Sequence, residues 1–335
     1  MRIGILGVAH VHSDQYVEHL RHAGADVVGA YDADPDRGAS WGKLHDVRYG
    51  GSLDALLAKE LSGVVICSET SRHPELTVAA ARAGLAILCE KPLATTEAGA
   101  RMMVKACSEA GVPLMTAFPT RLHPAVREAR RIVVAGGLGR LKALSGTNQS
   151  VMPMRERSWF ADPAWGGGGA MMDHIVHLAD LFCWMTNRRP LRVYGIANRL
   201  VHALVVPVET AGLVMLDFPD GVFGSIDCSW NRPLEYPTWG GMGFSVIGEE
   251  GTLTVDPFRQ RLTAYGGGRQ LEWIPWGVDT NQLLIEEFLQ GIGDGRTPSI
   301  TGTDGLVATL VALAALESAA SGQPVTMSRI QEEGS

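Results

Sequence analysis

The chain has 335 residues, of which 46% are hydrophobic and 19% charged, and its formal net charge is −7 at pH 7. This composition is typical of a globular protein and excludes a disordered or fibrous chain, and the length predicts two domains. The negative charge argues against a nucleic acid or an anionic membrane surface as a partner.

Three features predict a cytoplasmic protein with no membrane partner. The five cysteines have no paired spacing, which favours reduced thiols. The first expected strand begins at Arg2, which leaves no room for a signal peptide. The most apolar helical stretch, Gly305 to Leu316, is interrupted by Thr309. It is also shorter than the roughly 20 residues of a membrane span.

The first segment reads as the opening βα unit of a dinucleotide-binding fold. An apolar strand from Arg2 runs into a turn at Gly7, and a helix is expected from Ser13 to Ala23. The fingerprint is imperfect, because Ala9 and His12 stand where the second and third glycines are usual.

A second strand, Asp26 to Tyr31, ends at Asp32, 25 residues after Gly7, close to the spacing of an acid that binds the adenosine ribose. Asp32 alone could equally begin a turn. An acid at this position repels the 2′-phosphate of NADP, and Ala33 supplies no arginine to attract it. The sequence therefore predicts NAD, with NADP less favoured, although Arg37 could still reach that phosphate.

Strands and helices continue to alternate. Strands are expected over Gly63 to Cys67, Ala86 to Cys89 and Val112 to Phe118, with helices to Ala83 and to Ala110 between them. This order predicts an α/β fold with a doubly wound parallel sheet, a Rossmann domain over residues 1–120. A helix from His123 to Ala135 follows, with Arg127, Arg130 and Arg131 expected on a solvated face.

The strand that ends at Cys89 is followed by Glu90, Lys91 and Pro92. Ligands of open α/β sheets bind at the carboxyl ends of the strands, and a lysine placed there beside apolar walls can pass protons near neutral pH. Pro92 ends the strand, and a cis bond before it would fix the lysine. The alternative is a surface ion pair on a loop.

Residues 121–335 have a different pattern and predict a second α/β domain with a large, mostly antiparallel open sheet. After Leu141, the expected strands are Leu191–Asn198, Val201–Leu216, Val222–Trp230, Gly243–Ile247 and Gln270–Ile274. Four glycines before Ala170 lead into a helix on which Asp173 and His177 share a face. A carboxylate beside an imidazole is an acid/base arrangement, although a histidine on a helix is more often a packed core residue.

These segments occur together in an order that resembles the Gfo/Idh/MocA family over nearly the whole chain. The resemblance rests on Glu90-Lys91-Pro92, the helix from His73, Arg121-Leu-His-Pro124, and the pattern of Asp173, His177 and Asp180 after the glycines. It implies a nicotinamide-dependent oxidoreductase of sugars, polyols and related small molecules. Ile175 departs from the family pattern, in which glycine is usual, and His174 adds an imidazole.

The resemblance also implies site roles. Lys91, Asp173 and His177 are the catalytic residues that it implies. Arg155 and Trp159 are expected at a polyhydroxylated substrate because of their residue types, since a tryptophan face stacks on a sugar ring and an arginine binds hydroxyls or a carboxylate, and His174 is expected there as well. The expected cofactor-binding residues lie in the loops after the strands: Gly7, Val8, Ala9, His10, Val11, His12, Asp32, Ser68, Glu69, Thr70, His73, Glu90, Lys91, Pro92 and Arg121. Relatives commonly form dimers or tetramers through the second sheet, and the apolar strands here predict a homodimer or homotetramer.

Three other functions stay open. His10 and His12, with Asp173, His174 and His177, are rich enough in ligand atoms for a metal-dependent hydrolase or isomerase, although no metal is expected. The second alternative is a non-catalytic dinucleotide sensor. The third is a glycosidase that uses bound NAD without net redox change.

Overall fold

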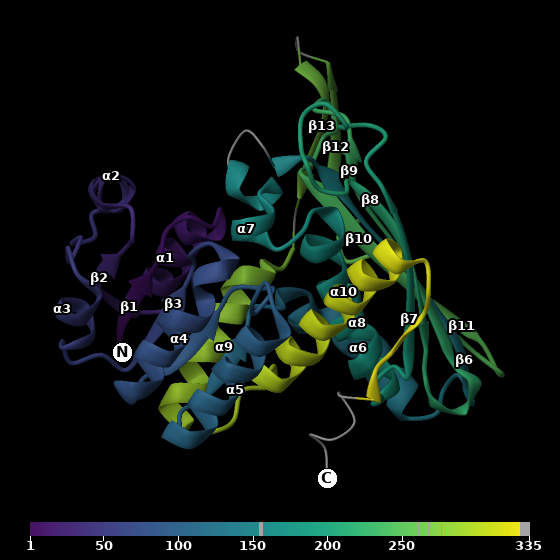
Figure 1. The fold of residues 1–335 in the computed structure, drawn as a ribbon, viewed down its shortest axis with the longest axis horizontal. Helices are drawn as coiled ribbons and strands as arrows, with labels where there is room; N and C mark the ends of the chain where they lie inside the picture. The colour runs from purple at the N-terminus through teal and green to yellow at the C-terminus, as the bar shows by residue number, and fades with distance from the viewer. Residues whose placement is uncertain (154–156, 260, 267–268, 276, 329–335) are drawn as a thin grey trace. The chain divides into compact units, whose positions relative to one another are not determined.

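The computed structural model describes residues 1–153, 157–259, 261–266, 269–275 and 277–328 (Figure 1). It divides into two compact units. Unit 1 comprises Met1–Pro119, Met154–Gly167 and Thr280–Thr309, and unit 2 comprises Thr120–Pro153, Gly168–Asp279 and Leu310–Ser335. The described residues 157–167 and 280–309 belong with unit 1, so the units are not two consecutive stretches of the chain.

Unit 1 is built on a parallel sheet in the order β2-β1-β3-β4-β5. Its elements are β1 (Arg2–Leu6), α1 (His12–His22), β2 (Asp26–Tyr31), α2 (Pro35–His45), α3 (Leu53–Leu57), β3 (Gly63–Ile66), η1 (Thr70–Arg72), α4 (His73–Arg82), β4 (Ala86–Cys89), α5 (Glu97–Ala110), β5 (Leu114–Thr116), η4 (Ser158–Ala161), α7 (Pro163–Gly166) and α9 (Thr280–Asp294). This confirms the doubly wound Rossmann sheet. The central strands β3 and β4 are buried along their whole length, as continuous apolar runs in a parallel sheet require.

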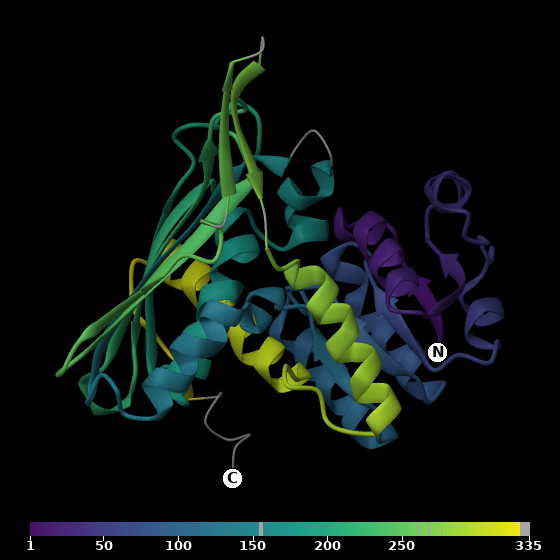
Figure 2. The same ribbon diagram turned by 180° about the vertical axis from the view of Figure 1, so that it is seen from behind.

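Four α-helices among the described residues of unit 1 were not expected from the sequence, α2, α3, α7 and α9. Helix α2 begins where the Asp34 side chain accepts the backbone N–H groups of Asp36 and Arg37, with Pro35 at its first turn. Its apolar periodicity is weak because Gly38 and Gly42 occupy its inner face. Helix α9 lies alongside α1 (Figure 2), where Asn281 Nδ2 donates to Gln15 Oε1 at 3.0 Å.

Unit 2 is built on a sheet in the order β11-β10-β6-β9-β8-β7-β14, in which only the β6–β9 pair is parallel among the described strands. Its elements are α6 (Pro124–Val134), β6 (Leu141–Val151), α8 (Ala170–Thr186), β7 (Arg192–Asn198), β8 (Ala211–Asp217), η5 (Pro219–Gly221), β9 (Phe223–Arg232), β10 (Gly240–Gly248), β11 (Thr252–Val255), β12 (Arg261–Gly266), β13 (Arg269–Pro275) and β14 (Val325–Thr326), with β12 and β13 pairing as a separate hairpin. The large, mostly antiparallel sheet is confirmed.

Helix α8 packs on β6, β8 and β9, and in both views the helices of unit 2 lie on one side of its sheet (Figures 1 and 2). Side chains therefore alternate along β8: Val214 and Leu216 are buried, whereas Leu213 and Met215 are exposed. The exposed positions form an apolar outer face.

Two expectations for unit 2 were wrong. The strand expected over Val201–Leu216 begins only at Ala211, because residues 201–205 form a turn that precedes Pro207. Arg130 is not on a solvated face, since its guanidinium lies over the Trp184 ring and donates to Met185 O.

Two elements cross from one unit to the other, η2 (Pro119–Leu122) and α10 (Gly302–Ser321). Helix α10 is longer than expected: its 20 residues are long and apolar enough to cross a membrane. However, 61% of its most apolar window is buried inside the protein, and its Thr309 Oγ1 accepts the backbone N–H of Leu93 at 3.2 Å. Burial of this kind is typical of a core helix.

Candidate active site

The dinucleotide loop after β1 has a backbone that only glycine suits at its first position. Gly7 has a φ of +79°, and a Cβ there would lie 2.4 Å from the Cβ of Ser68. Gly7 N–H donates to Tyr31 O at 2.7 Å, which ties the loop to the end of β2. The chain can therefore pass close to the β3 end and reach the start of α1, where a helix N-terminus attracts phosphate.

Asp32 closes the other side of this loop. Its Oδ2 accepts the Val8 backbone N–H at 2.7 Å, its Oδ1 accepts that of Asp34 at 2.8 Å, and the residue is 2% exposed. Arg37 reaches both oxygens, at 3.2 Å from Nε and 2.8 Å from Nη2. A tight glycine turn, a helix start beside it and an acid at the end of β2 are the features that suit a bound NAD molecule.

The two departures from the glycine fingerprint have structural partners. Ala9 is buried, and its carbonyl accepts a hydrogen bond from Trp159 Nε1 at 3.1 Å. His12 begins α1 and turns its ring toward β4, where Nδ1 lies 2.8 Å from Glu90 Oε1. A histidine in place of the third glycine thus links the loop to the segment that carries Lys91.

Glu90 is the centre of a buried polar network. Its carboxylate accepts hydrogen bonds from Tyr16 Oη at 2.7 Å, from His12 Nδ1, and from the Lys91 backbone N–H at 3.1 Å. Burial alone would raise its pKa, but His10, His12 and Lys91 outweigh burial and hold the pKa of Glu90 well below its usual value. Glu90 therefore stays a carboxylate beside Lys91.

The same cluster has the composition of a metal site, because ligand atoms of His10, His12 and Glu90 all lie within 4.8 Å of one another. The His12 backbone N–H donates to His10 Nδ1 at 3.3 Å, and His10 Nε2 lies 3.7 Å from Glu90 Oε2. A metal bound to Nε2 would require the tautomer with a proton on Nδ1, which would break the hydrogen bond from the His12 N–H.

Lys91 lies at the carboxyl end of β4 and is 5% exposed. Its peptide bond to Pro92 is cis, as anticipated. His73, fully buried at the start of α4, places Nδ1 3.0 Å from Pro92 O and Nε2 3.3 Å from Ser68 O. It therefore joins the loops that follow β3 and β4 and holds the lysine segment in place.

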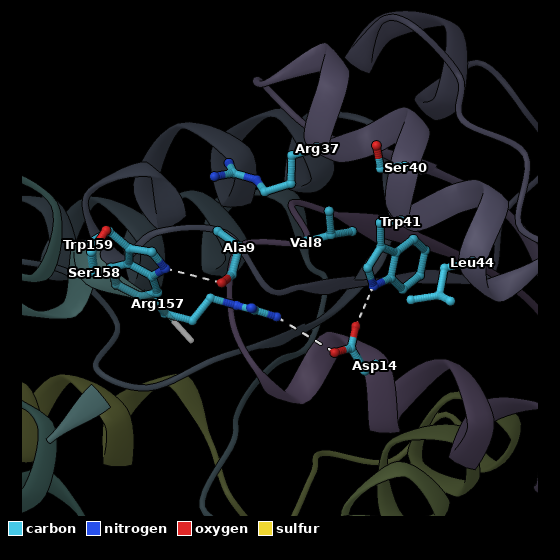
Figure 3. Close-up of a pocket in the computed structure, with 10 residues that line it drawn as sticks. All are labelled: Val8, Ala9, Asp14, Arg37, Ser40, Trp41, Leu44, Arg157, Ser158 and Trp159. Carbon is cyan, nitrogen blue, oxygen red and sulfur yellow. Dashed lines mark hydrogen bonds and ion pairs between the residues drawn. The ribbon is translucent and has the colours of Figure 1, made fainter. Parts of the chain in front are cut away.

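A pocket of about 460 Å³ opens between the dinucleotide loop and α2 (Figure 3). In the close-up, Trp41 and Arg157 both point to Asp14, at 2.8 Å from Trp41 Nε1 and 3.6 Å from Arg157 Nη2. The residues around it are Val8, Ala9, Asp14, Arg37, Ser40, Trp41, Leu44, Arg157, Ser158 and Trp159. Sequence reasoning missed Ser40, Trp41 and Leu44, because α2 has little periodicity, and it also missed Asp14 on α1 and Ser158.

In unit 2, α8 presents the two expected catalytic side chains. From Ala170 to Phe182, Asp173 and His177 are the residues that are not buried, and they lie one turn apart on the same face. The Glu209 carboxylate accepts the backbone N–H groups of Gly169 at 2.8 Å and Met171 at 3.0 Å. A Cβ on Gly169 would lie 1.9 Å from Glu209 O, so this glycine lets the chain enter α8.

Asp173 has two partners that the sequence did not reveal. Its Oδ2 accepts Trp230 Nε1 at 3.1 Å and lies 3.1 Å from His174 Nε2. His174 is buried, with Nδ1 2.8 Å from Asn148 O and Nε2 3.2 Å from Ser150 Oγ. Both ring nitrogens therefore lie close to protein groups, and the substrate contact expected for His174 stays a prediction.

Arg121, expected at the cofactor, has a different partner in unit 2. It is 4% exposed and forms a two-point ion pair with Asp180, at 2.8 Å from Nε to Oδ2 and 2.5 Å from Nη2 to Oδ1. The Trp184 ring covers its guanidinium. Arg155, expected at the substrate, lies outside the described residues.

Both halves of the chain match family models. Residues 1–118 match an oxidoreductase family with an NAD-binding Rossmann fold, and residues 126–254 match the GFO/IDH/MocA C-terminal domain. The chain is 28% identical to 1,5-anhydro-D-fructose reductase of Ensifer adhaerens, over 96% of this chain and 97% of the relative. It is 26% identical to myo-inositol 2-dehydrogenase of Thermotoga maritima, over 95% and 96% of the two chains.

Solved structures agree with the fold. GenD2 from gentamicin A biosynthesis, in complex with NAD, superposes with a TM-score of 0.88 at 25% identity, over 98% of this chain and 96% of that one. Levoglucosan dehydrogenase, in complex with NADH and levoglucosan, gives a TM-score of 0.83 at 21% identity, over 98% and 99%.

Proposed function

The chain belongs to the GFO/IDH/MocA family of oxidoreductases with an NAD-binding Rossmann domain, and we propose that it transfers a hydride between NAD(H) and a hydroxyl or carbonyl carbon of a sugar, cyclitol or sugar acid. The observation that carries the proposal lies in unit 1. Asp32 holds the dinucleotide loop through Val8 N–H, and Lys91 stands at the same carboxyl edge of the same sheet. Ligands bind at that edge in open α/β sheets.

Each residue has a defined task in this reaction. When bound, NAD supplies the hydride acceptor. His177 exchanges the hydroxyl proton with the substrate, and Asp173 holds the His177 imidazole in the required tautomer. Lys91 donates a hydrogen bond to the reacting oxygen or relays its proton, and it does so beside the Glu90 carboxylate, whose pKa is held well below its usual value.

The names of similar proteins support the substrate class. They include a 1,5-anhydro-D-fructose reductase and a myo-inositol 2-dehydrogenase, both of which act on polyhydroxylated rings. Tryptophan faces can stack on the C–H surface of such a ring, and Trp159 is the side chain that we assign to this contact. Its indole N–H, bound to Ala9 O, fixes the ring beside the dinucleotide loop.

A second copy of the chain is the partner that we propose. Exposed apolar side chains meet in cross-strand pairs on the outer face of the unit 2 sheet, Tyr194 with Met215 and Ile196 with Leu213. Contiguous apolar surface of this kind marks an association face. We also propose that the protein works in the cytoplasm, a reducing compartment that suits five cysteines without paired spacing in the sequence.

The test has two steps. NADH binding is measured first by fluorescence titration, and formation of reduced cofactor is then followed with NAD across a panel of polyols, sugars and sugar acids. Turnover of at least one polyhydroxylated substrate is expected. Turnover of only a planar aromatic alcohol would refute the substrate class, and metal-dependent hydrolysis without NADH binding would refute the oxidoreductase. Glycoside cleavage that needs NAD but leaves it unreduced would assign the glycosidase instead.

A further inference from the structure

Arg37 is held by two acids that come from different loops of unit 1. Its Nη2 lies 2.8 Å from Asp32 Oδ1 and 2.7 Å from Glu69 Oε1, and its Nε donates to Asp32 Oδ2 at 3.2 Å. Asp32 follows β2, whereas Glu69 follows β3. The two hydrogens of a single guanidinium nitrogen thus bridge the two loops.

The acids are more buried than the arginine that they hold. The side chains of Asp32 and Glu69 are 1% and 10% exposed, and that of Arg37 is 32% exposed. Burial alone would lower the pKa of Arg37, but the two carboxylates outweigh burial and raise it. Arg37 is therefore a permanent cation whose hydrogen bonds are directed to protein carboxylates.

Arg37 is also the basic residue nearest to Asp32 that could bind a phosphate on the adenosine ribose. To do so, its guanidinium must leave at least one carboxylate. That acid would remain buried with one fewer counter-charge, next to a phosphate of the same sign. The free energy needed to move Arg37 to the phosphate therefore rises with the number of carboxylates that bind it.

We propose that Glu69 is a second specificity-determining acid, which acts with Asp32 to keep Arg37 from the 2′-phosphate of NADP. This inference rests on the proposed function and extends it. Asp32 repels the 2′-phosphate directly. Glu69 forms a second ion pair with Arg37, the cation that could otherwise bind that phosphate. Loss of Asp32 by itself then leaves Arg37 bound to Glu69.

The test compares NADH and NADPH dissociation constants for the full-length wild type, Glu69→Gln, Asp32→Asn and the double variant. Both substitutions keep side-chain shape and remove charge. We expect the ratio of the NADPH to the NADH dissociation constant to fall roughly tenfold in Glu69→Gln. The double variant should gain more NADPH affinity than the product of the two single gains, because only it releases Arg37 from both charges.

Glu75→Gln is the matched control. Glu75 pairs at 2.9 Å with Arg72, which also lies 3.8 Å from Glu69 Oε2. Its loss therefore removes one negative charge from the same neighbourhood but leaves both carboxylates on Arg37. Its NADPH affinity should stay near that of the wild type. Adding Arg37→Leu to the double variant should abolish the NADPH gain, since the gain depends on the freed guanidinium.

The outcomes separate this inference from the proposed function. Wild-type protein that binds NADH, together with equal NADPH affinities for Glu69→Gln and Glu75→Gln, would overturn the role of Glu69 alone. Wild-type protein that binds neither cofactor would overturn the proposed function, and this inference with it. Retained NADH binding by Glu69→Gln shows that the variant is folded.

Discussion

At the scale of single residues, the turnover of a Lys91 variant is the most direct test of the proposed chemistry. If Lys91 acts on the reacting oxygen, Lys91→Ala should lower turnover by roughly 10²-fold or more and leave NADH affinity nearly unchanged. Lys105→Ala, at an exposed position on α5 paired with Glu109, is the control and should keep full turnover. Full turnover of Lys91→Ala with lower thermal stability would instead make the lysine structural.

His73 predicts how stability depends on pH. Burial lowers the pKa of His73 below its ordinary value, although the carbonyls of Pro92 and Ser68 oppose this, and burial lowers the pKa of His123 as well. Below about pH 6.5, the unfolded chain therefore binds protons that the folded protein does not. The free energy of unfolding should fall as the pH drops, by up to about 1.4 kcal/mol per pH unit for each group.

Urea unfolding at a series of pH values checks this effect. His73→Gln keeps an amide that can hydrogen-bond to the same carbonyls, and its stability should fall less steeply between about pH 5 and 6.5 than that of the wild type. His22→Gln, at an exposed position on α1, is the control. Equal slopes for all three proteins would show that His73 does not carry the dependence.

At the scale of elements, the start of α8 depends on a residue that lies next to β8. Glu209 caps the helix that carries Asp173 and His177 by accepting two of its first backbone N–H groups. Glu209→Ala removes this acceptor and should lower the free energy of unfolding by about 1 to 2 kcal/mol. Glu209→Gln keeps a carbonyl oxygen and should restore most of that loss in the same denaturation experiment.

Turnover is an independent measure of how well Glu209 holds the start of α8. A frayed α8 would misplace Asp173 and His177, so Glu209→Ala should also turn over more slowly, with NADH affinity unchanged because the dinucleotide loop belongs to unit 1. Glu250→Ala removes an exposed acid of unit 2 and should change neither quantity. A stable, fully active Glu209→Ala protein would contradict the capping role.

At the scale of the whole molecule, the outer face of the unit 2 sheet predicts self-association. Leu213→Lys places a charge in the middle of the apolar face, beside Ile196 on β7. We expect the wild type to be a dimer or tetramer by light scattering at micromolar concentration, and this variant to dissociate. Val134→Lys, at an exposed position on α6, is the control. A strictly monomeric wild type would contradict the prediction.

The sequence by itself determined the Rossmann sheet, the Gly7 turn and the position of Lys91. These features follow from local physics: continuous apolar runs form buried parallel strands, and glycine is needed where φ is positive. The sequence also predicted that Asp173 and His177 lie on one face of a helix, because residues four apart are neighbours on a helix surface. Such properties depend on neighbours within a few residues.

Only the tertiary structure decided which side chains meet. The pairing of Arg37 with Glu69, of His12 with Glu90 and of Trp230 with Asp173 joins residues between 32 and 78 positions apart. No local period encodes such pairs, because they depend on strand order and helix packing. For the same reason, residues 157–167 could not be assigned to unit 1 from the sequence. The apolar run after Val201 has the composition of a strand, but residues 201–205 form a turn before Pro207.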